Sequence, residues 1–261
     1  MIIALSAANV LDTGQIAPLA VPGTHRHCDL DKEGSERMSD AYDAMEAVFS
    51  ARYSCRAFKP DPVPRSDIER IVALARRVPS WCNAQPWQLV IASGTETDRF
   101  REALQAEVQT ASHQSDIPFP DGYSGVYQNR RRTCGFQLYQ AVGIERGDRE
   151  GRADQMMRNF AFFDAPHVAI LTSPAELGPY GAMDCGGFVT AFTTAATSLG
   201  IATIPQAAIA SYSPLVHRHF GIDEDRLVLC AISFGYADEH NPANNFRTER
   251  ADVEDIVDWR D

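Results

Sequence analysis

Three stretches of the chain repeat apolar residues at the spacing of a helix. In residues 40–49, one helix face would hold Ala41, Met45, Val48 and Phe49. After the sequence KPDPVPR, Ser66 and Glu69 have the spacing of a capping box. The apolar stripe that follows ends at Pro79 and contains Ile68, Ile71, Val72, Ala75 and Val78. In residues 97–111 the aligned residues are Phe100, Leu104 and Val108. This pattern predicts three amphipathic helices.

Short apolar runs predict the strands. They are QLVIAS at 88–93, HVAILT from His167, and RLVLCAISFGY at 226–236. The sequence GIATIP at 200–205 predicts a short strand or a turn. All of these runs are far too short to span a bilayer.

Further helices complete the pattern. Residues 183–199 are rich in small residues and apolar on nearly every side, which predicts a central core helix. Ser213 and Pro214 predict a helix with Ser213 as its N-cap, and DVEDIVDW predicts a final helix. Because helices outnumber strands and do not alternate regularly with them, the pattern favours a mixed α+β layer structure.

The beginning of the chain lacks such a pattern. Residues 1–40 mix Gly, Pro, His and charged residues, so we expect a poorly ordered extension before one domain at 41–261. Met38 opens the periodic segment and is a candidate native start, with residues 1–37 upstream of it. HRHC at 25–28 suggests a metal, but it lacks further ligands nearby, and an incidental cluster is the favoured interpretation.

Composition narrows the class of protein. The 261 residues are 44% apolar and 23% charged, as in an ordinary globular chain. The net charge of −11 disfavours nucleic acid, because phosphate binding needs a basic surface. The six cysteines form no C-x-x-C pair, and no Lys or Arg precedes the N-terminal apolar run. We therefore expect a cytoplasmic protein without a secretory signal, which binds neither nucleic acid nor membrane.

Common catalytic motifs do not occur in the sequence. There is no G-x-G-x-x-G after a strand, no P-loop and no G-x-S-x-G elbow. His217 and His219 stand two residues apart and would face different directions on a helix, so they predict surface residues and no metal site. Four short sequences remain as candidates for chemistry.

The first candidate is ARYSCRAF at 51–58. In an extended segment Arg52, Ser54 and Arg56 would share one face, because side chains alternate between the two faces. Two guanidiniums and a hydroxyl suit a phosphate. On spacing alone, a solvated strand edge explains the pattern equally well.

The other three candidates are turns. PSWCNAQPW at 79–87 displays amide and hydroxyl groups that can read the edge of a planar heterocycle, although a loop that ends a helix is the simpler interpretation. TIPQAA begins at Thr203, and there Pro205 should interrupt a strand and free backbone N–H groups. FRTER at 246–250 lies at the base of a C-terminal arm.

Taken in this order, the four sequences resemble the flavin-dependent nitroreductase family, from about residue 45 to the C-terminus. The likeness consists of R-x-S-x-R-x-F, P-S-x-x-N-x-Q-P-W, a Gly-Ile turn that leads to a proline, and an arginine ahead of the final helix. It implies an α+β fold with a central, mainly antiparallel sheet flanked by helices. It further implies an interlocked homodimer with C-terminal arm exchange and one FMN in each of two interfacial sites.

The resemblance also implies site residues. Those that would hold the FMN phosphate and ribityl chain are Arg52, Ser54, Arg56 and Arg250, with Tyr53 in a position that often contacts through its backbone. Those that would meet the flavin from the second subunit are Pro79, Ser80, Trp81, Asn83 and Gln85. Those that would lie against the isoalloxazine are Pro205, Gln206 and Ala207, with an N–H near Ala207 pointing at flavin N5. Arg247 matches the family less firmly than Arg250.

The implied reaction is a ping-pong transfer. NADPH or NADH reduces the flavin at N5, and an electron-poor aromatic acceptor, nitrobenzoate-type compounds first, then takes its place. No catalytic triad is expected, since the cofactor carries the hard step. Reductive dehalogenation, ene reduction, flavin cleavage, and flavin binding without turnover remain open as alternatives.

The middle segment, 112–165, is expected to decide the acceptor. Roughly one or two of its aromatic residues should contact the substrate. The candidates are Phe119, Tyr123, Tyr127, Phe136, Tyr139, Phe160, Phe162 and Phe163. NRRR at 129–132 suits a substrate carboxylate or the NADPH ribose phosphate, although a solvated helix face is the favoured interpretation.

Overall fold

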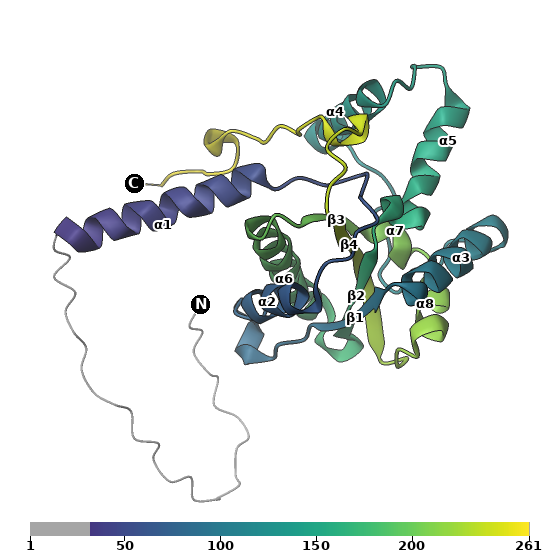
Figure 1. Ribbon diagram of the computed structural model, residues 1–261, viewed down its shortest axis with the longest axis horizontal. Helices are drawn as coiled ribbons and strands as arrows, with labels where there is room; N and C mark the ends of the chain where they lie inside the picture. Colours follow the sequence, from purple (N-terminus) through teal and green to yellow (C-terminus); the bar gives the residue numbers. More distant parts are fainter. Residues whose placement is uncertain (1–31, 261) are drawn as a thin grey trace, which may run out of the picture. The chain divides into compact units, whose positions relative to one another are not determined.

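One antiparallel sheet organises the fold. In the computed structural model, which describes residues 32–260, the strands are β1 (Gln88–Ser93), β2 (His167–Pro174), β3 (Ala202–Gln206) and β4 (Arg226–Gly235) (Figure 1). Their order in the sheet is β1-β2-β4-β3, and every pairing is antiparallel. The predicted strands and the antiparallel sheet are therefore confirmed.

Side-chain alternation along the strands builds a core on each face of this sheet. Val168 and Ile170 of β2 belong to one cluster, while Ala169 and Leu171 belong to the other. All four are fully buried. Because both faces of β2 are covered, its sequence reads as a continuous apolar run rather than an alternating one.

Helices cover the two faces, as Figure 1 shows. On one face lie α2 (Arg65–Ala75) and α6 (Gly178–Ser198). On the other lie α3 (Thr95–Thr110), the short α7 (Ala207–Ala210) and α8 (Ser213–Phe220). Phe100 and Leu104 of the predicted α3 stripe are fully buried. The α+β class is confirmed.

The ends of the chain depart from the prediction. Helix α1 spans Lys32–Ala51 and so begins before residue 40. HRHC at 25–28 and most of the predicted extension lie outside the described residues. DVEDIVDW does not form a helix, because only a single 3₁₀ turn, η5 (Val253–Asp255), occurs there and none of its side chains is buried. Without an apolar surface to cover, so short a segment does not sustain a helix.

Two predicted helix caps are wrong. Helix α2 begins at Arg65 behind Pro64, and Ser66 lies inside its first turn without a capping hydrogen bond. The N-cap position of α8 belongs to Tyr212, while the Ser213 hydroxyl donates to the carbonyl of Ala210 at 2.8 Å. In both cases a proline next to the helix start already sets the backbone direction.

Helix α6 is not buried on every side in the single chain. Cys185, Phe188 and Phe192 pack into the core, but Met183, Gly186 and Gly187 are exposed. Gly187 lines a groove of about 660 Å³ that α6 forms with the α1 residues from Ala44 to Phe49 and the end of α2. Helix α6 therefore has two different faces, one packed into the core and one exposed along the groove.

His217 and His219 are mostly buried, so the prediction of surface residues is wrong. Their side chains are 18% and 16% exposed. His217 Nε2 lies 2.9 Å from Asp116 Oδ2, and His219 Nε2 lies 2.9 Å from Glu96 Oε1. Each histidine thus joins α8 to an acidic residue far away in the sequence.

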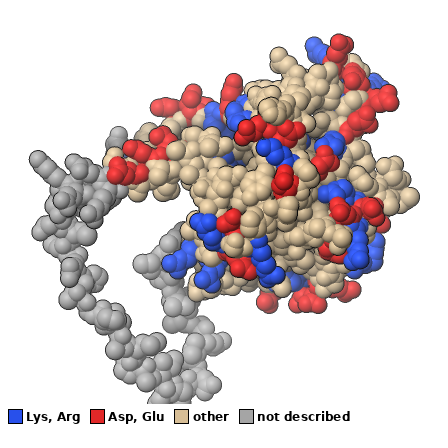
Figure 2. Space-filling model, viewed as in Figure 1, with Lys and Arg blue, Asp and Glu red and all other residues tan. Residues whose placement is uncertain are grey.

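The middle segment forms α4 (Gly125–Ala141), α5 (Arg149–Met157) and the 3₁₀ segment η2 (Arg158–Asp164). Phe160, Phe162 and Phe163 of η2 are core residues. The exposed aromatic residues of the segment are Phe119, Tyr123, Tyr127 and Phe136. On the face shown in Figure 2, acidic and basic side chains are interspersed.

Candidate functional site

A pocket of about 300 Å³ lies beside β3, the edge strand of the sheet. Ser54 and Arg56 line it from the segment that follows α1, and Pro205, Gln206 and Ala207 line it from the end of β3. The remaining lining residues include Leu138, Tyr139, Gln155, Met156 and Asn159. Two of the predicted sequences, 150 residues apart in the chain, thus meet in one cavity.

The segment carrying Ser54 and Arg56 is extended and attached to β3. Ser54 forms a parallel bridge with Thr203, and the N–H of Cys55 donates to the Thr203 carbonyl at 3.0 Å. Because side chains alternate along this segment, Cys55 is buried in the core while Ser54 and Arg56 line the pocket. The predicted shared face is confirmed for Ser54 and Arg56.

Asn244 holds the other side of this segment, and the sequence analysis missed it. Its side-chain oxygen accepts from the Arg56 N–H at 2.7 Å, and its amide nitrogen donates to the carbonyls of Ala57 and Asp238, both at 2.9 Å. The side chain is buried. An Asn in a Pro/Asn-rich arm carries no signal of such a role, because the partner backbone is 188 residues away.

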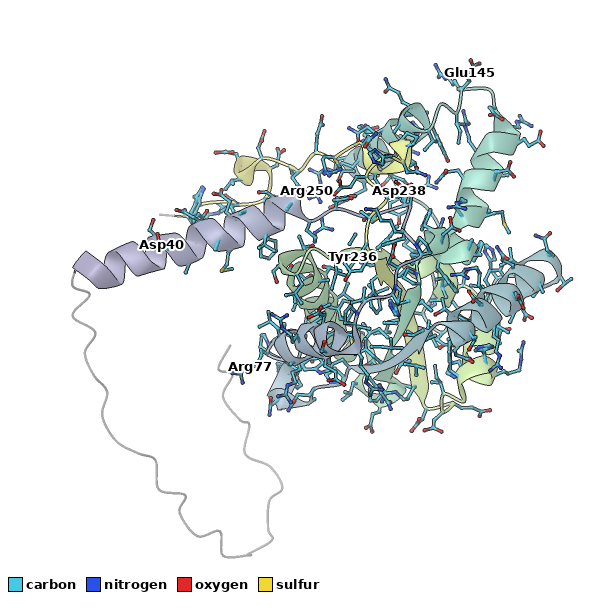
Figure 3. The ribbon with its side chains drawn as sticks, viewed as in Figure 1. Asp40, Arg77, Glu145, Tyr236, Asp238 and Arg250 are labelled. Carbon is cyan, nitrogen blue, oxygen red and sulfur yellow. The ribbon has the colours of Figure 1, made fainter. Side chains whose placement is uncertain are left out.

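The arginines of the site gather without acidic partners. Burial lowers the pKa of Arg52, and the positive charge of Arg250 lowers it further. Burial also lowers the pKa of Arg56, whose guanidinium lies 5.5 Å from the ring centroid of Phe246. Within residues 32–260, the side chain of Arg250, which is labelled in Figure 3, donates to the Thr248 hydroxyl and to the carbonyls of Thr248 and Glu249. Within residues 32–260 none of the three arginines forms a salt bridge, so this end of the site favours an anion.

Arg247 and Tyr53 form a further contact between these segments. The Arg247 guanidinium lies 3.8 Å from the centroid of the Tyr53 ring and donates to the carbonyls of Asn244 and Phe246. This cation–π contact ties the FRTER sequence to the first candidate sequence. The structure therefore brings the first, third and fourth candidate sequences together.

The turn at the end of β3 differs from its prediction in one respect. Pro205 does not interrupt the strand, because β3 continues through it, paired with Ile232 of β4. An edge strand tolerates proline, since its outer N–H needs no ladder partner. The Gln206 side chain is buried and donates to the Asn159 carbonyl at 2.9 Å, while Ala207 is exposed at the start of α7. The turn from Pro205 to Ala207 therefore lines the pocket without a large side chain at Ala207.

The second candidate sequence lies elsewhere in the chain. Trp81–Asn83 form a single 3₁₀ turn, η1, that packs against α6, and no residue from Pro79 to Gln85 lines the pocket. Asn83 and Gln85 are exposed. One chain alone therefore unites only part of the predicted site residues.

Other kinds of site find no support in the described part of the chain. Among residues 32–260 there is no group of three or more His, Cys, Asp or Glu residues arranged to hold a metal ion. No described helix is long and apolar enough to cross a membrane.

Comparison with known proteins decides the family. Residues 49–236, most of the chain, match the nitroreductase family. The chain belongs to the nitroreductase family. The expected resemblance is confirmed, and with it the fold built on an antiparallel sheet flanked by helices.

Several nitroreductases are similar over nearly their whole length. Nitroreductase NfnB of Mycolicibacterium smegmatis is 36% identical, over 84% of this chain and 93% of its own. A 4-nitrobenzoate reductase of Pseudomonas putida is 32% identical, over 80% and 92%. The crystal structure of the FMN-dependent NfnB from Mycobacterium smegmatis, in complex with NADPH, superposes with a TM-score of 0.82 at 34% identity, over 85% of this chain and 100% of that one.

Proposed function

We propose that this nitroreductase binds FMN and uses NADPH or NADH to reduce nitroaromatic compounds. The observation that carries the proposal is a pocket lined both by Ser54 and Arg56 and by the exposed turn at Ala207. Arg52, four residues before Arg56, and Arg250, whose charge acts on Arg52, add positive charge outside this lining, and none of the three arginines forms a salt bridge within residues 32–260. A phosphate at the arginines and a ring beside the turn fit this arrangement. The similar nitroreductases described as FMN-dependent and bound to NADPH support it.

Each group of residues has its own task in the proposed site. Arg52, Arg56, Arg250 and the Ser54 hydroxyl bind the phosphate and ribityl chain, with Tyr53 beside them. The N–H near Ala207 orients the ring at N5, and Gln206 holds that turn through Asn159. When bound, FMN supplies hydride transfer in a ping-pong cycle between the nicotinamide and the acceptor. No residue of this chain is assigned as a catalytic acid or base.

The active form is proposed to be a homodimer that exchanges its C-terminal arms. Pro79, Ser80, Trp81, Asn83 and Gln85 lie outside the pocket in one chain, so the partner subunit would supply them. The exposed face of α6 with its groove, and the exposed apolar side chains Val253, Ile256 and Trp259 of the arm, supply surfaces for the contact. We further propose that residues 41–261 form the working domain and that the protein acts in the cytoplasm.

Flavin uptake and turnover test the proposal. Purified protein reconstituted with FMN should show the flavin absorbance bands, NADPH should bleach them without oxygen, and 4-nitrobenzoate should restore them. A protein that does not retain FMN contradicts the proposed function. If FMN is retained but only a halophenol or an activated alkene restores the bands, the proposed FMN site is supported and the proposed nitroaromatic acceptor is wrong.

A further inference from the structure

The loop that carries Ser80 and Asn83 has a strained backbone. Cys82, Asn83 and Gln85 have positive φ angles of 49°, 58° and 51°, a region that residues other than glycine rarely adopt. All three residues are exposed, so packing of their side chains in the core does not hold this conformation. Strain of this kind persists only where surrounding contacts determine the backbone, and it is common at ligand sites.

Hydrogen bonds inside the loop account for part of the restraint. The Asn83 N–H donates to the Ser80 carbonyl at 3.1 Å, and the Gln85 N–H donates to the Ser80 hydroxyl at 2.9 Å. Both bonds join residues of the loop to one another, so they do not attach the loop to the helices or the sheet. The Asn83 side-chain amide has no hydrogen-bond partner among residues 32–260.

Asp184 anchors the beginning of the loop. Its Oδ2 atom accepts from the Trp81 N–H at 2.9 Å, across 103 residues of sequence. Asp184 lies on α6, and the Tyr180 ring, one turn earlier on that helix, lies 5.1 Å from the Trp81 ring. A charged acceptor makes this a strong bond to a backbone that is otherwise exposed.

Arg226 anchors the end of the loop. Its Nη2 atom donates to the Pro86 carbonyl at 3.0 Å, and the same guanidinium donates to the hydroxyl and the carbonyl of Thr172 at 2.8 and 3.1 Å. Thr172 and Arg226 belong to β2 and β4, the central strands of the sheet. The fork of the guanidinium thus joins the loop to the two central strands of the sheet.

We propose that Asp184 and Arg226 are positioning residues that hold the 80–86 loop in its strained conformation and so aim Ser80 and Asn83 at the flavin. This inference rests on the proposed function, because it assigns those two side chains to FMN. Neither anchor touches the proposed cofactor pocket in this chain. Their effect is therefore transmitted through the backbone of the loop.

Flavin titration of anchor variants tests the inference. FMN fluorescence quenching should show at least about a tenfold loss of affinity in Asp184→Ala and in Arg226→Ala. Asp184→Asn keeps a side-chain oxygen to accept from Trp81, so its affinity should stay within about twofold of wild type. The melting temperature of each protein without FMN is measured in parallel, and Asp67→Ala, a partly exposed acid on α2, serves as the matched control.

The possible outcomes separate this inference from the proposed function. Loss of affinity in Asp184→Ala with rescue in Asp184→Asn supports positioning, because a merely destabilised protein would not regain affinity through a conservative change. If wild type binds FMN and both alanine variants bind it equally well, the positioning role is overturned while the proposed function stands. If wild type itself binds no FMN, both are overturned.

Discussion

Arg52 and Arg250 place like charges close together at the predicted phosphate end of the site. Burial lowers the pKa of Arg52, and the positive charge of Arg250 lowers it further, because two like charges near each other repel. Bound phosphate would convert that repulsion into two attractions. The arrangement is therefore costly when the site is empty and favourable when it is filled.

Replacing Arg250 with alanine should weaken FMN binding without weakening the fold. A charge-assisted hydrogen bond contributes about 1.5–3 kcal/mol, so the dissociation constant should rise roughly 10- to 150-fold. The melting temperature without FMN should not fall, since a repulsive charge is removed. Titration calorimetry measures the dissociation constant of FMN, with Arg99→Ala, an exposed arginine of α3, as the control. An unchanged affinity would remove Arg250 from the site.

His167 and His217 should give folding opposite pH dependences. Burial lowers the pKa of His167, whose Nε2 accepts from the Val63 N–H at 2.8 Å. The unfolded chain therefore binds the proton first, and stability falls as the pH drops below the ordinary histidine value of 6.5. Burial pulls the pKa of His217 down as well, but its hydrogen bonds to Asp116 and the Ile222 carbonyl raise it overall. Its contribution is full below 6.5 and is lost as the pH rises through the folded-state pKa.

Denaturant unfolding as a function of pH separates the two histidines. His167→Gln should weaken the pH dependence of the free energy of unfolding below pH 6.5. His217→Gln should weaken that dependence above pH 6.5. Each variant acts as the control for the other. Parallel curves for both variants and wild type would show that neither histidine titrates differently in the folded state.

At the scale of elements, helix starts were predicted less well than helix interiors. Most of the predicted stripe residues are buried, namely Ile68, Ile71 and Ala75 of α2 and Phe100 and Leu104 of α3, because burial of an apolar face dominates helix stability. Caps depend on the local backbone instead. The capping box at Ser66 is absent, whereas Asp148 caps α5 by accepting from the Gly151 N–H at 2.8 Å.

Substitutions at the two helix starts should therefore differ. Ser66→Ala should change the free energy of unfolding by less than about 0.5 kcal/mol, since no capping bond is lost. Asp148→Ala should destabilise α5 by about 0.5–2 kcal/mol. Hydrogen exchange of the α2 and α5 amides reads out each helix separately. Faster hydrogen exchange across α2 in Ser66→Ala would instead indicate that Ser66 does cap this helix, as the sequence predicts.

At the scale of the whole molecule, the exposed face of α6 can be tested as a subunit contact. A Cβ atom added at Gly187 would meet nothing within 4 Å, so Gly187→Glu fits the single chain. In the proposed homodimer the same carboxylate would enter the contact between subunits without a partner. Light scattering after size exclusion should give twice 28.8 kDa for wild type and 28.8 kDa for the variant.

A matched glycine controls for the added charge. Gly147 lies in the loop between α4 and α5, and a Cβ there also meets nothing within 4 Å. Gly147→Glu should keep the wild-type mass. A wild-type protein that runs as a monomer at micromolar concentration would contradict the homodimer, and with it the supply of Asn83 from a partner subunit.

Features that depend on near neighbours in the chain can be predicted from the amino-acid sequence. Apolar periodicity located the interiors of α2 and α3, short apolar runs located the strands, and a small, apolar composition located α6. The ordered motifs indicated the family, because each of these signals lies within a few residues of chain. Side-chain alternation also predicted that Ser54 and Arg56 would share a face if their segment was extended. None of these inferences needed a contact across the fold.

The contacts between groups that are distant in the sequence became evident from the folded chain. It placed Asn244 on the backbone of Arg56, Arg250 beside Arg52, and Asp184 and Arg226 on the loop at 81–86. It also showed that one face of α6 is exposed and that the C-terminal segment is not a helix. Such pairings follow from how the sheet and its helices pack, and a side chain's type and position in the sequence do not specify its partner 100 or more residues away.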